Sequence, residues 1–300
     1  MSSAPTIFPL EDSSESSPAR RWRFGLMVRY VMAAFVALLF LGPIFWMVSS
    51  SLKGNNQIFA TPPVLFPSHP QFTNYHDAVN YIPFWTYLRN SLLTTVAAVV
   101  GTIISCVPVA YALSFLKWRL KGLTFGIVLV SMMLPFPAIM IPWYIVFRHL
   151  GWIGSLWPLS GPPFVAEFVT PAFSSAIAVF LLRQFFVSIP QEIVEAAKID
   201  GAGHARILWQ IIRPLARPVL TTVVIMTFLA SWTAFIGPLI FQSNTNVFTL
   251  SVGLQQYQSQ HFTAYNLLLA ASVLFLIPVL VVFIFGQRYF VQGSSRTGLK

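Results

Sequence analysis

Six long apolar runs constrain the fold of this chain more than any other feature of its sequence. They lie at about 30–50, 91–115, 123–147, 168–188, 215–241 and 265–287. The hydrocarbon core of a bilayer is about 30 Å thick, so a helix needs roughly 20 apolar residues to cross it. The sequence therefore predicts an all-α membrane protein with six transmembrane helices, for which the lipid bilayer is the solvent.

The composition leaves no room for a second, soluble domain. Only 9% of the 300 residues are charged, against about 25% in soluble domains. We expect a disordered N-terminal tail over 1–22, a membrane domain over 23–292 and a C-terminal tail over 293–300. A cleaved signal peptide is disfavoured, because the first run is too long and no small-residue cleavage site follows it. The single cysteine, Cys106, excludes an intramolecular disulfide.

The net charge of +10 follows the predicted membrane topology. If the N-terminus is cytoplasmic and the chain crosses six times, fifteen of the 18 Lys and Arg residues lie inside. Only Lys53, Arg89 and Arg148 lie outside, and the external loop 242–264 has no Lys or Arg. This is the bias that the positive-inside rule describes. We therefore expect a multi-pass protein of the cytoplasmic membrane with both termini in the cytoplasm, and no binding to nucleic acid.

The middle of every apolar run lacks Asp, Glu, His and Lys. Charges within the membrane mark proton relays and ion-coupled transport, so their absence argues against an ion-driven transporter or a channel with charged rings. A membrane enzyme would need a convergent set of nucleophile, base or metal ligands, and the histidines fit no metal-binding spacing. We expect no cofactor and no metal. Prolines predict helix breaks at 133–137, Gly237-Pro238 and Pro278.

A polar segment over 189–214 separates the fourth run from the fifth. Ser188 can cap a helix, with Gln191 reaching back to it as in a capping box and Pro190 tolerated in the first turn. Gly201 permits the left-handed turn that ends a helix. A second helical stretch, 205–212, then runs to Pro214. The segment is predicted to be a short helix–turn–helix on the cytoplasmic face.

Within this segment, Ala196 and Ala197 are predicted to form a flat patch that another protein can approach closely. Glu195 and Asp200 add acidic charge to a region that is otherwise basic. The alternative is an ordinary amphipathic connector with a solvated charged face.

The spacing of these residues resembles the EAA motif of ABC importer permeases. That motif reads EAA, three residues, Gly, nine residues, Ile, one residue and Leu-Pro, and it is matched here by Glu195-Ala196-Ala197, Gly201, Ile211 and Pro214, with Arg213 in place of Leu. Other stretches extend the likeness, among them Ala110-Tyr111-Ala112-Leu113 and Thr249-Leu-Ser-Val-Gly-Leu254. The chain resembles permease subunits of binding-protein-dependent carbohydrate importers, especially the second, smaller permease of the maltose type.

The resemblance implies the type I ABC importer permease fold and import of a sugar or related polyol. It implies a coupling helix that contacts the ATPase through these residues: Glu195, Ala196, Ala197, Asp200, Gly201, Ile211 and Pro214. The chain contains no GxxxxGK[ST] phosphate loop, so ATP hydrolysis is expected on a separate subunit. The implied partners are a second homologous permease, two ATP-binding subunits and an extracytoplasmic sugar-binding protein. A secondary transporter or channel that is not coupled to ATP is the alternative.

The predicted topology places Asn246 outside and Ala202 inside the cell. A membrane-impermeant thiol reagent added from outside should label an Asn246→Cys variant and leave an Ala202→Cys variant unlabelled. Labelling of both variants from outside would contradict the topology.

Overall fold

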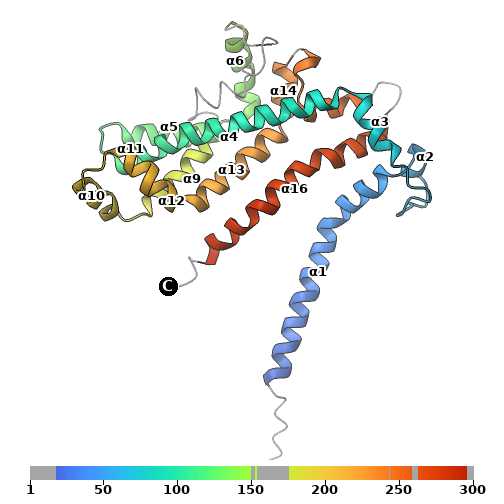
Figure 1. Cartoon of the computed structure of the whole chain (residues 1–300), viewed down its shortest axis with the longest axis horizontal. Helices are drawn as coiled ribbons and strands as arrows, with labels where there is room; N and C mark the ends of the chain where they lie inside the picture. The colour runs from blue at the N-terminus through green and yellow to red at the C-terminus, as the bar shows by residue number, and fades with distance from the viewer. Residues whose placement is uncertain (1–17, 150–152, 154–175, 243, 259–262, 296–300) are drawn as a thin grey trace, which may run out of the picture.

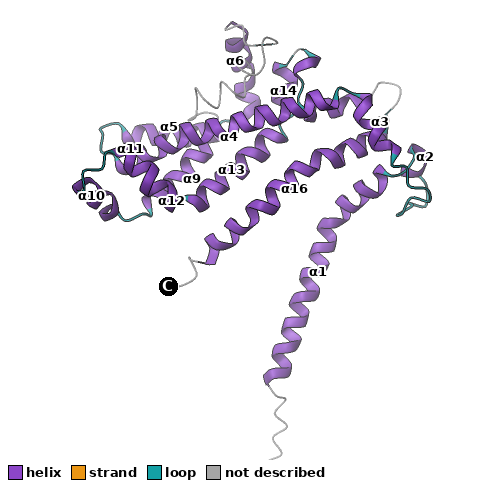
Figure 2. Ribbon diagram, in the orientation of Figure 1, coloured by secondary structure: helices purple, strands orange, loops and turns teal. Residues whose placement is uncertain are grey.

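The regular structure of this chain is helical (Figure 2). The computed structural model describes residues 18–149, 153, 176–242, 244–258 and 263–295, and no β-strand occurs among them. The prediction of an all-α protein is confirmed for this part of the chain.

Among the described residues, three helices are long and apolar enough to cross a bilayer. They are α1 (Pro18–Ser51), α4 (Phe84–Phe115) and α16 (Tyr265–Ser295), with qualifying stretches Leu26–Ser51, Phe84–Phe115 and Tyr265–Gln287. The first, second and sixth predicted spans are therefore helical, although α4 begins well before residue 91. Pro278 lies inside α16 without interrupting it.

Both predicted tail boundaries need correction. Helix α1 begins at Pro18, inside the predicted tail 1–22, which fits the preference for proline at the first position of a helix. Helix α16 continues to Ser295, past the predicted boundary at 292. Residues 1–17 and 296–300 lie outside the described part of the chain.

The third predicted span is not one straight helix. Helices α5 (Lys121–Met133) and α6 (Phe136–His149) meet at an angle of 104°. The predicted break at 133–137 is confirmed, and Leu134 and Pro135 separate the two helices there. Helices α9 (Ala176–Val187) and α10 (Gln191–Ile199) also form a bent pair, at 77°. Residues 168–175 of the fourth predicted span are not among those described.

The fifth span begins and ends differently from its prediction. Helix α13 (Arg217–Trp232) follows a bend of 83° after His204–Leu215, and a separate short helix, α14 (Ile236–Phe241), comes after it. The break lies at 233–235, not at Gly237-Pro238. Pro238 instead falls within the first turn of α14, where its missing N–H has no intrahelical partner to lose.

Short elements gather at the two ends of the helix bundle (Figure 1). At one end lie α10, α11 (His204–Arg206) and α12 (Arg213–Leu215), and at the other lie α2 (Asn55–Ile58) and α3 (Thr73–Tyr81). Most basic residues predicted to be cytoplasmic belong to segments at the α10 end. This arrangement fits the positive-inside argument, and the orientation itself stays a prediction.

Each end has its own hydrophobic core. The α10-end core joins α4, α9, α10 and α13 through buried side chains that include Leu113, Leu182, Phe186, Ile207 and Val223. The α3-end core joins α3, α4 and α16 to α15 (Leu250–Gly253) and the 3-10 helix η3 (Leu254–Tyr257). It contains Tyr257, whose hydroxyl donates a 2.7 Å hydrogen bond to the Ala78 carbonyl. The bundle is therefore fastened at both ends.

Helix α1 leaves the bundle. It lies beside α16 near the α3 end and diverges from it toward its own N-terminus (Figure 1). Its apolar side chains are largely exposed, for example Phe40 at 73%. Exposure of this kind is expected where side chains face hydrocarbon instead of water.

A buried polar cluster ties the C-terminal end of α1 to α3 and α16. Asn74, 2% exposed, donates from Nδ2 to the carbonyls of Ser51 (2.9 Å) and Lys53 (3.0 Å), and Asn266 Nδ2 donates to Asn74 Oδ1 (3.0 Å). The Lys53 ammonium donates to the Val64 carbonyl at 2.6 Å, and burial lowers its pKa from the ordinary value. Because these groups are withdrawn from water, their mutual hydrogen bonds fix where α1 joins the bundle.

Removing the Asn74 amide should therefore destabilise this joint. An Asn74→Ala variant leaves the Ser51 and Lys53 carbonyls unpaired, at a cost of about 1–3 kcal/mol per buried group. We expect a lower midpoint of thermal unfolding for the detergent-solubilised protein. The matched control is Asn80→Ala on the same helix, since Asn80 is exposed and bonds only to His76. Equal midpoints for the two variants would contradict a structural role for the cluster.

Candidate coupling site

The first helix of the predicted coupling segment 189–214 is α10, which begins at Gln191, directly after Pro190. The predicted capping box is wrong. Ser188 Oγ donates to the Phe185 carbonyl at 2.7 Å, and α10 has no side-chain cap. Ser188 follows α9 directly, so its hydroxyl finds an acceptor in the helix that ends there.

Gly201 ends α10 as predicted. Its φ is +78°, its N–H donates to the Lys198 carbonyl (3.0 Å), and the Ala202 N–H donates to the Ala197 carbonyl (2.9 Å). These two bonds make a Schellman motif, which satisfies carbonyls left unpaired at a helix end. A side chain at 201 would meet no neighbour, so the requirement for glycine comes from the backbone alone.

The predicted flat patch of Ala196 and Ala197 is wrong for Ala197. Ala196 is exposed, but Ala197 is 7% exposed and belongs to the α10-end core together with Val194. Neighbouring residues of a helix point about 100° apart, so both side chains cannot share one face. Ala197 thus attaches α10 to the bundle.

The exposed face of α10 is a different set, spaced three and four residues apart: Glu192, Glu195, Ala196 and Ile199. We call these four residues the α10 outer face. Ile199 is 86% exposed, and the EAA motif did not point to it. Its spacing from Glu192, Glu195 and Ala196 is the sequence signal that places it there.

The second half of the segment is helical but not regular. Between α11 and α12, residues Ile207–Ile212 form the π-helix η1, and the helical conformation continues to Leu215, not to 212 as predicted. A proline ring at 214 clashes with the carbonyl four residues before it in a regular α-helix, and a wider turn relieves this clash. Ile212 is buried and Ile211 is half-buried against the α10-end core.

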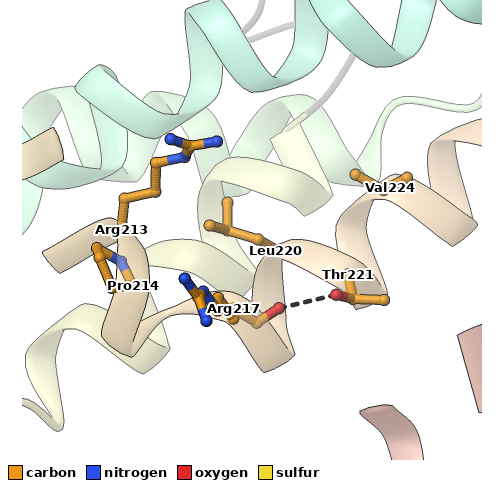
Figure 3. Close-up of a pocket in the computed structure, with 6 residues that line it drawn as sticks. All are labelled: Arg213, Pro214, Arg217, Leu220, Thr221 and Val224. Atoms are coloured by element: carbon orange, nitrogen blue, oxygen red, sulfur yellow. Dashed lines mark hydrogen bonds between the residues drawn. The ribbon is translucent and has the colours of Figure 1, made fainter. Parts of the chain in front are cut away.

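Pro214 lines a small cavity of about 320 Å³ where the segment enters α13 (Figure 3). Arg213, Arg217, Leu220, Thr221 and Val224 line it too. The Arg213 guanidinium lies 5.4 Å from the centre of the Trp209 ring. The charge that replaces leucine in the motif is therefore accommodated by an aromatic face.

A groove of about 690 Å³ lies between α10 and the end of α4, and its lining combines apolar side chains with Lys117, Glu195, Lys198 and His204. The Tyr111 hydroxyl lies 2.9 Å from His204 Nδ1 and joins the two sides. Of the predicted coupling residues, only Glu195 borders this groove. Ala197 and Ile211 face the α10-end core, and Pro214 lies by the cavity near α13.

Within the described residues, no cluster of three or more His, Cys, Asp or Glu side chains is arranged to hold a metal.

Ala196 is exposed and Ala197 is buried, so we predict opposite effects on stability when each is replaced by Trp. Ala197→Trp should overpack the core and lower stability by about 1–3 kcal/mol, whereas Ala196→Trp should leave stability unchanged. The measurement is the thermal unfolding midpoint of each variant in detergent. A normal midpoint for Ala197→Trp would contradict its burial.

The sequence of this chain is similar to those of known transport proteins. The family of binding-protein-dependent transport system inner membrane components matches residues 106–296. The sn-glycerol-3-phosphate transport system permease protein UgpE of Yersinia pestis is 32% identical over 272 residues, which cover 88% of this chain and 94% of that protein. The arabinooligosaccharides transport system permease protein AraQ of Halalkalibacterium halodurans is 28% identical over 289 residues, covering 95% and 99%.

The solved structures include a similar fold. A chain of a bacterial ABC transporter involved in the import of the acidic polysaccharide alginate superimposes with a TM-score of 0.75 and 27% identity, over 91% of this chain and 98% of that one. The predicted permease fold is thereby confirmed. The chain belongs to the family of binding-protein-dependent transport system inner membrane components.

Proposed function

We propose that this chain is the permease subunit of an ABC importer that moves a sugar or related polyol across the cytoplasmic membrane. The observation that carries the proposal is the α10–Gly201–η1 segment, which presents an exposed face while its other face is built into the bundle. Membership of the family supports the same conclusion. The named activities of its relatives, glycerol-3-phosphate and arabinooligosaccharide transport, support the substrate class.

The α10 outer face is the surface that we assign to the ATPase. It combines two carboxylates, the small side chain of Ala196 and the exposed Ile199. A central apolar side chain with a charged rim is the usual form of a protein interface. Glu195 and Asp200 remain exposed, and both are proposed to contact the same partner.

The buried face of α10 transmits movements of the ATPase to the helix bundle. Val194 and Ala197 are buried in the core that contains Leu182 of α9 and Ile207 of η1. The Tyr111–His204 hydrogen bond fastens the segment to α4 as well. Because closely packed groups move together, a displacement of α10 by the ATPase would shift these helices and drive alternating access.

Because this chain contributes only the permease, the importer needs further subunits. Hydrolysis takes place on two separate ATP-binding subunits, a second homologous permease completes the pathway, and an extracytoplasmic binding protein delivers the substrate. Both termini and Glu195 lie in the cytoplasm.

The turn at Gly201 is the test of coupling. Gly201→Val places a β-branched residue at φ +78°, a conformation that costs about 1–2 kcal/mol, and should misdirect η1 relative to α10. We expect normal membrane insertion, low substrate uptake and ATP hydrolysis that no longer responds to loaded binding protein. The assay is ATPase activity of the reconstituted complex with and without that protein.

Gly203→Val is the matched control. Gly203 has φ −70° and ψ 160°, which valine adopts readily, and a side chain there meets nothing. It should retain coupled hydrolysis. Equal, normal stimulation in both variants would mean that the turn at 201 is not a coupling joint.

A further inference from the structure

A positively charged cavity lies where the coupling segment enters α13. It is the small cavity beside Pro214, and we call it the Pro214 cavity. Its volume of about 320 Å³ is at the lower end of the roughly 300–1,000 Å³ found for small-molecule sites. The lining residues recur every three or four positions, so they form one stripe along α12 and α13. They are Arg213, Pro214, Arg217, Leu220, Thr221 and Val224.

This lining carries two positive charges and no negative one. Arg213 and Arg217 are both exposed, and no Asp or Glu belongs to the lining. Among the described residues, the only ion pair joins His76 to Asp77, so neither guanidinium is paired with a described carboxylate. Trp209 offers a ring face to Arg213 but no charge. The cavity therefore presents positive charge that no described carboxylate neutralises.

The hydrogen-bond donors of the lining suit a phosphate group. The Thr221 hydroxyl is already used, because it donates to the Arg217 carbonyl at 2.9 Å (Figure 3). The guanidiniums of Arg213 and Arg217 remain, and guanidinium binds phosphate through paired, charge-assisted hydrogen bonds. Arg217 is also the first residue of α13, and the N-terminus of a helix adds partial positive charge.

The charge is confined to one end of the cavity. Figure 3 shows Arg213 at one end of the row and Val224 at the other, with Leu220 between them. Val224 lies seven positions after Arg217, which places it about 10 Å further along the helix axis. Leu220 and Val224 are half-buried, so part of each apolar side chain is open to a ligand. A charged head followed by an apolar stretch matches a phospholipid better than a free phosphate.

The position of the cavity on α13 corresponds to the headgroup region of a bilayer. Helix α13 carries no charged residue after Arg217, so Arg217 marks the start of the apolar span. Lys and Arg at the end of a span lie at the polar face of the membrane, and basic pockets on the cytoplasmic side bind anionic headgroups. Arg213 stands where the EAA motif has leucine, so its charge belongs to this chain and not to the motif.

We propose that the Pro214 cavity binds an anionic phospholipid of the cytoplasmic leaflet. The phosphate accepts hydrogen bonds from the Arg213 and Arg217 guanidiniums, and an acyl chain lies against Leu220 and Val224. Arg213 precedes the 83° bend and Arg217 follows it, so the bound phosphate bridges the bend. A zwitterionic lipid carries a cation that the arginines repel, so phosphatidylglycerol is preferred to phosphatidylcholine. The choice of leaflet rests on the proposed orientation.

Lipid retention by the complete transporter tests this site. Native mass spectrometry counts the lipids bound when the detergent-solubilised transporter is titrated with dioleoylphosphatidylglycerol or dioleoylphosphatidylcholine. We expect tighter retention of phosphatidylglycerol. Arg213→Gln and Arg217→Gln should each weaken its binding about fivefold, the effect of one basic residue near an anionic lipid surface. Arg213→Lys keeps the charge and should lose less than Arg213→Gln.

Arg206→Gln is the matched control. Arg206 is an exposed arginine of the same segment, lies outside the lining and bonds through Nε to Gln210 Oε1 at 2.9 Å. Because salt screens an exposed charge away from the site, its loss should change phosphatidylglycerol binding by less than about twofold. Unfolding midpoints without added lipid check that all variants are folded. An equal loss in the three glutamine variants would mean diffuse attraction to the basic face and would overturn the site.

Two further measurements separate the lipid from other occupants. Inorganic phosphate in excess should not displace phosphatidylglycerol, because it lacks the acyl chain that contacts Leu220 and Val224. Full displacement would assign the cavity to a soluble anion. Retention by the isolated chain but not by the complete transporter would assign it to a contact with another subunit. Either result would overturn the lipid site and leave the importer function standing, because neither measures ATP-dependent uptake.

Discussion

Hydrocarbon offers no hydrogen-bond partner to a peptide group, and the whole structure follows from this constraint. Each spanning segment must pair its own N–H and C=O groups, so α1, α4 and α16 are long uninterrupted helices. The same constraint gives significance to the breaks at 134–135 and 233–235. At the breaks the pairing is local: the Leu134 N–H donates to the Ser131 carbonyl and the Ala234 N–H to the Ser231 carbonyl. Both breaks face one large cavity, which residues of α4, α6, α9, α13 and α14 line.

The bundle is held by a core at each end, with the large cavity between them. At the α10 end, the core includes residues of the coupling segment itself, such as Val194, Ala197 and Ile207. That segment is therefore not a loop attached to a finished bundle. A force applied to the α10 outer face would reach α4 and α9 through closely packed side chains, which is what coupling to an ATPase requires.

Helix α13 connects the coupling segment to the large cavity. It begins at Arg217, directly after the bend that follows α12, and ends at Trp232 beside the second break. The Trp232 indole donates to the Phe275 carbonyl at 3.1 Å and stacks on the Phe275 ring at 5.4 Å, which anchors this end against α16. Thr227 and Ser231 line the large cavity from the same helix. A change in the direction of α13 at Arg217 would therefore change the shape of the cavity directly, because the same helix borders both the coupling segment and the cavity.

The sequence by itself determined the helical membrane class and the glycine turn at 201, because both depend on local properties: apolar run length and one residue's backbone freedom. It also predicted the break near Pro135. Only the tertiary structure decided which side of α10 faces outward, since Ala196 and Ala197 have equal local preference and differ only in what packs against them. The same holds for the large cavity, whose lining comes from five helices that the sequence keeps far apart and only packing brings together.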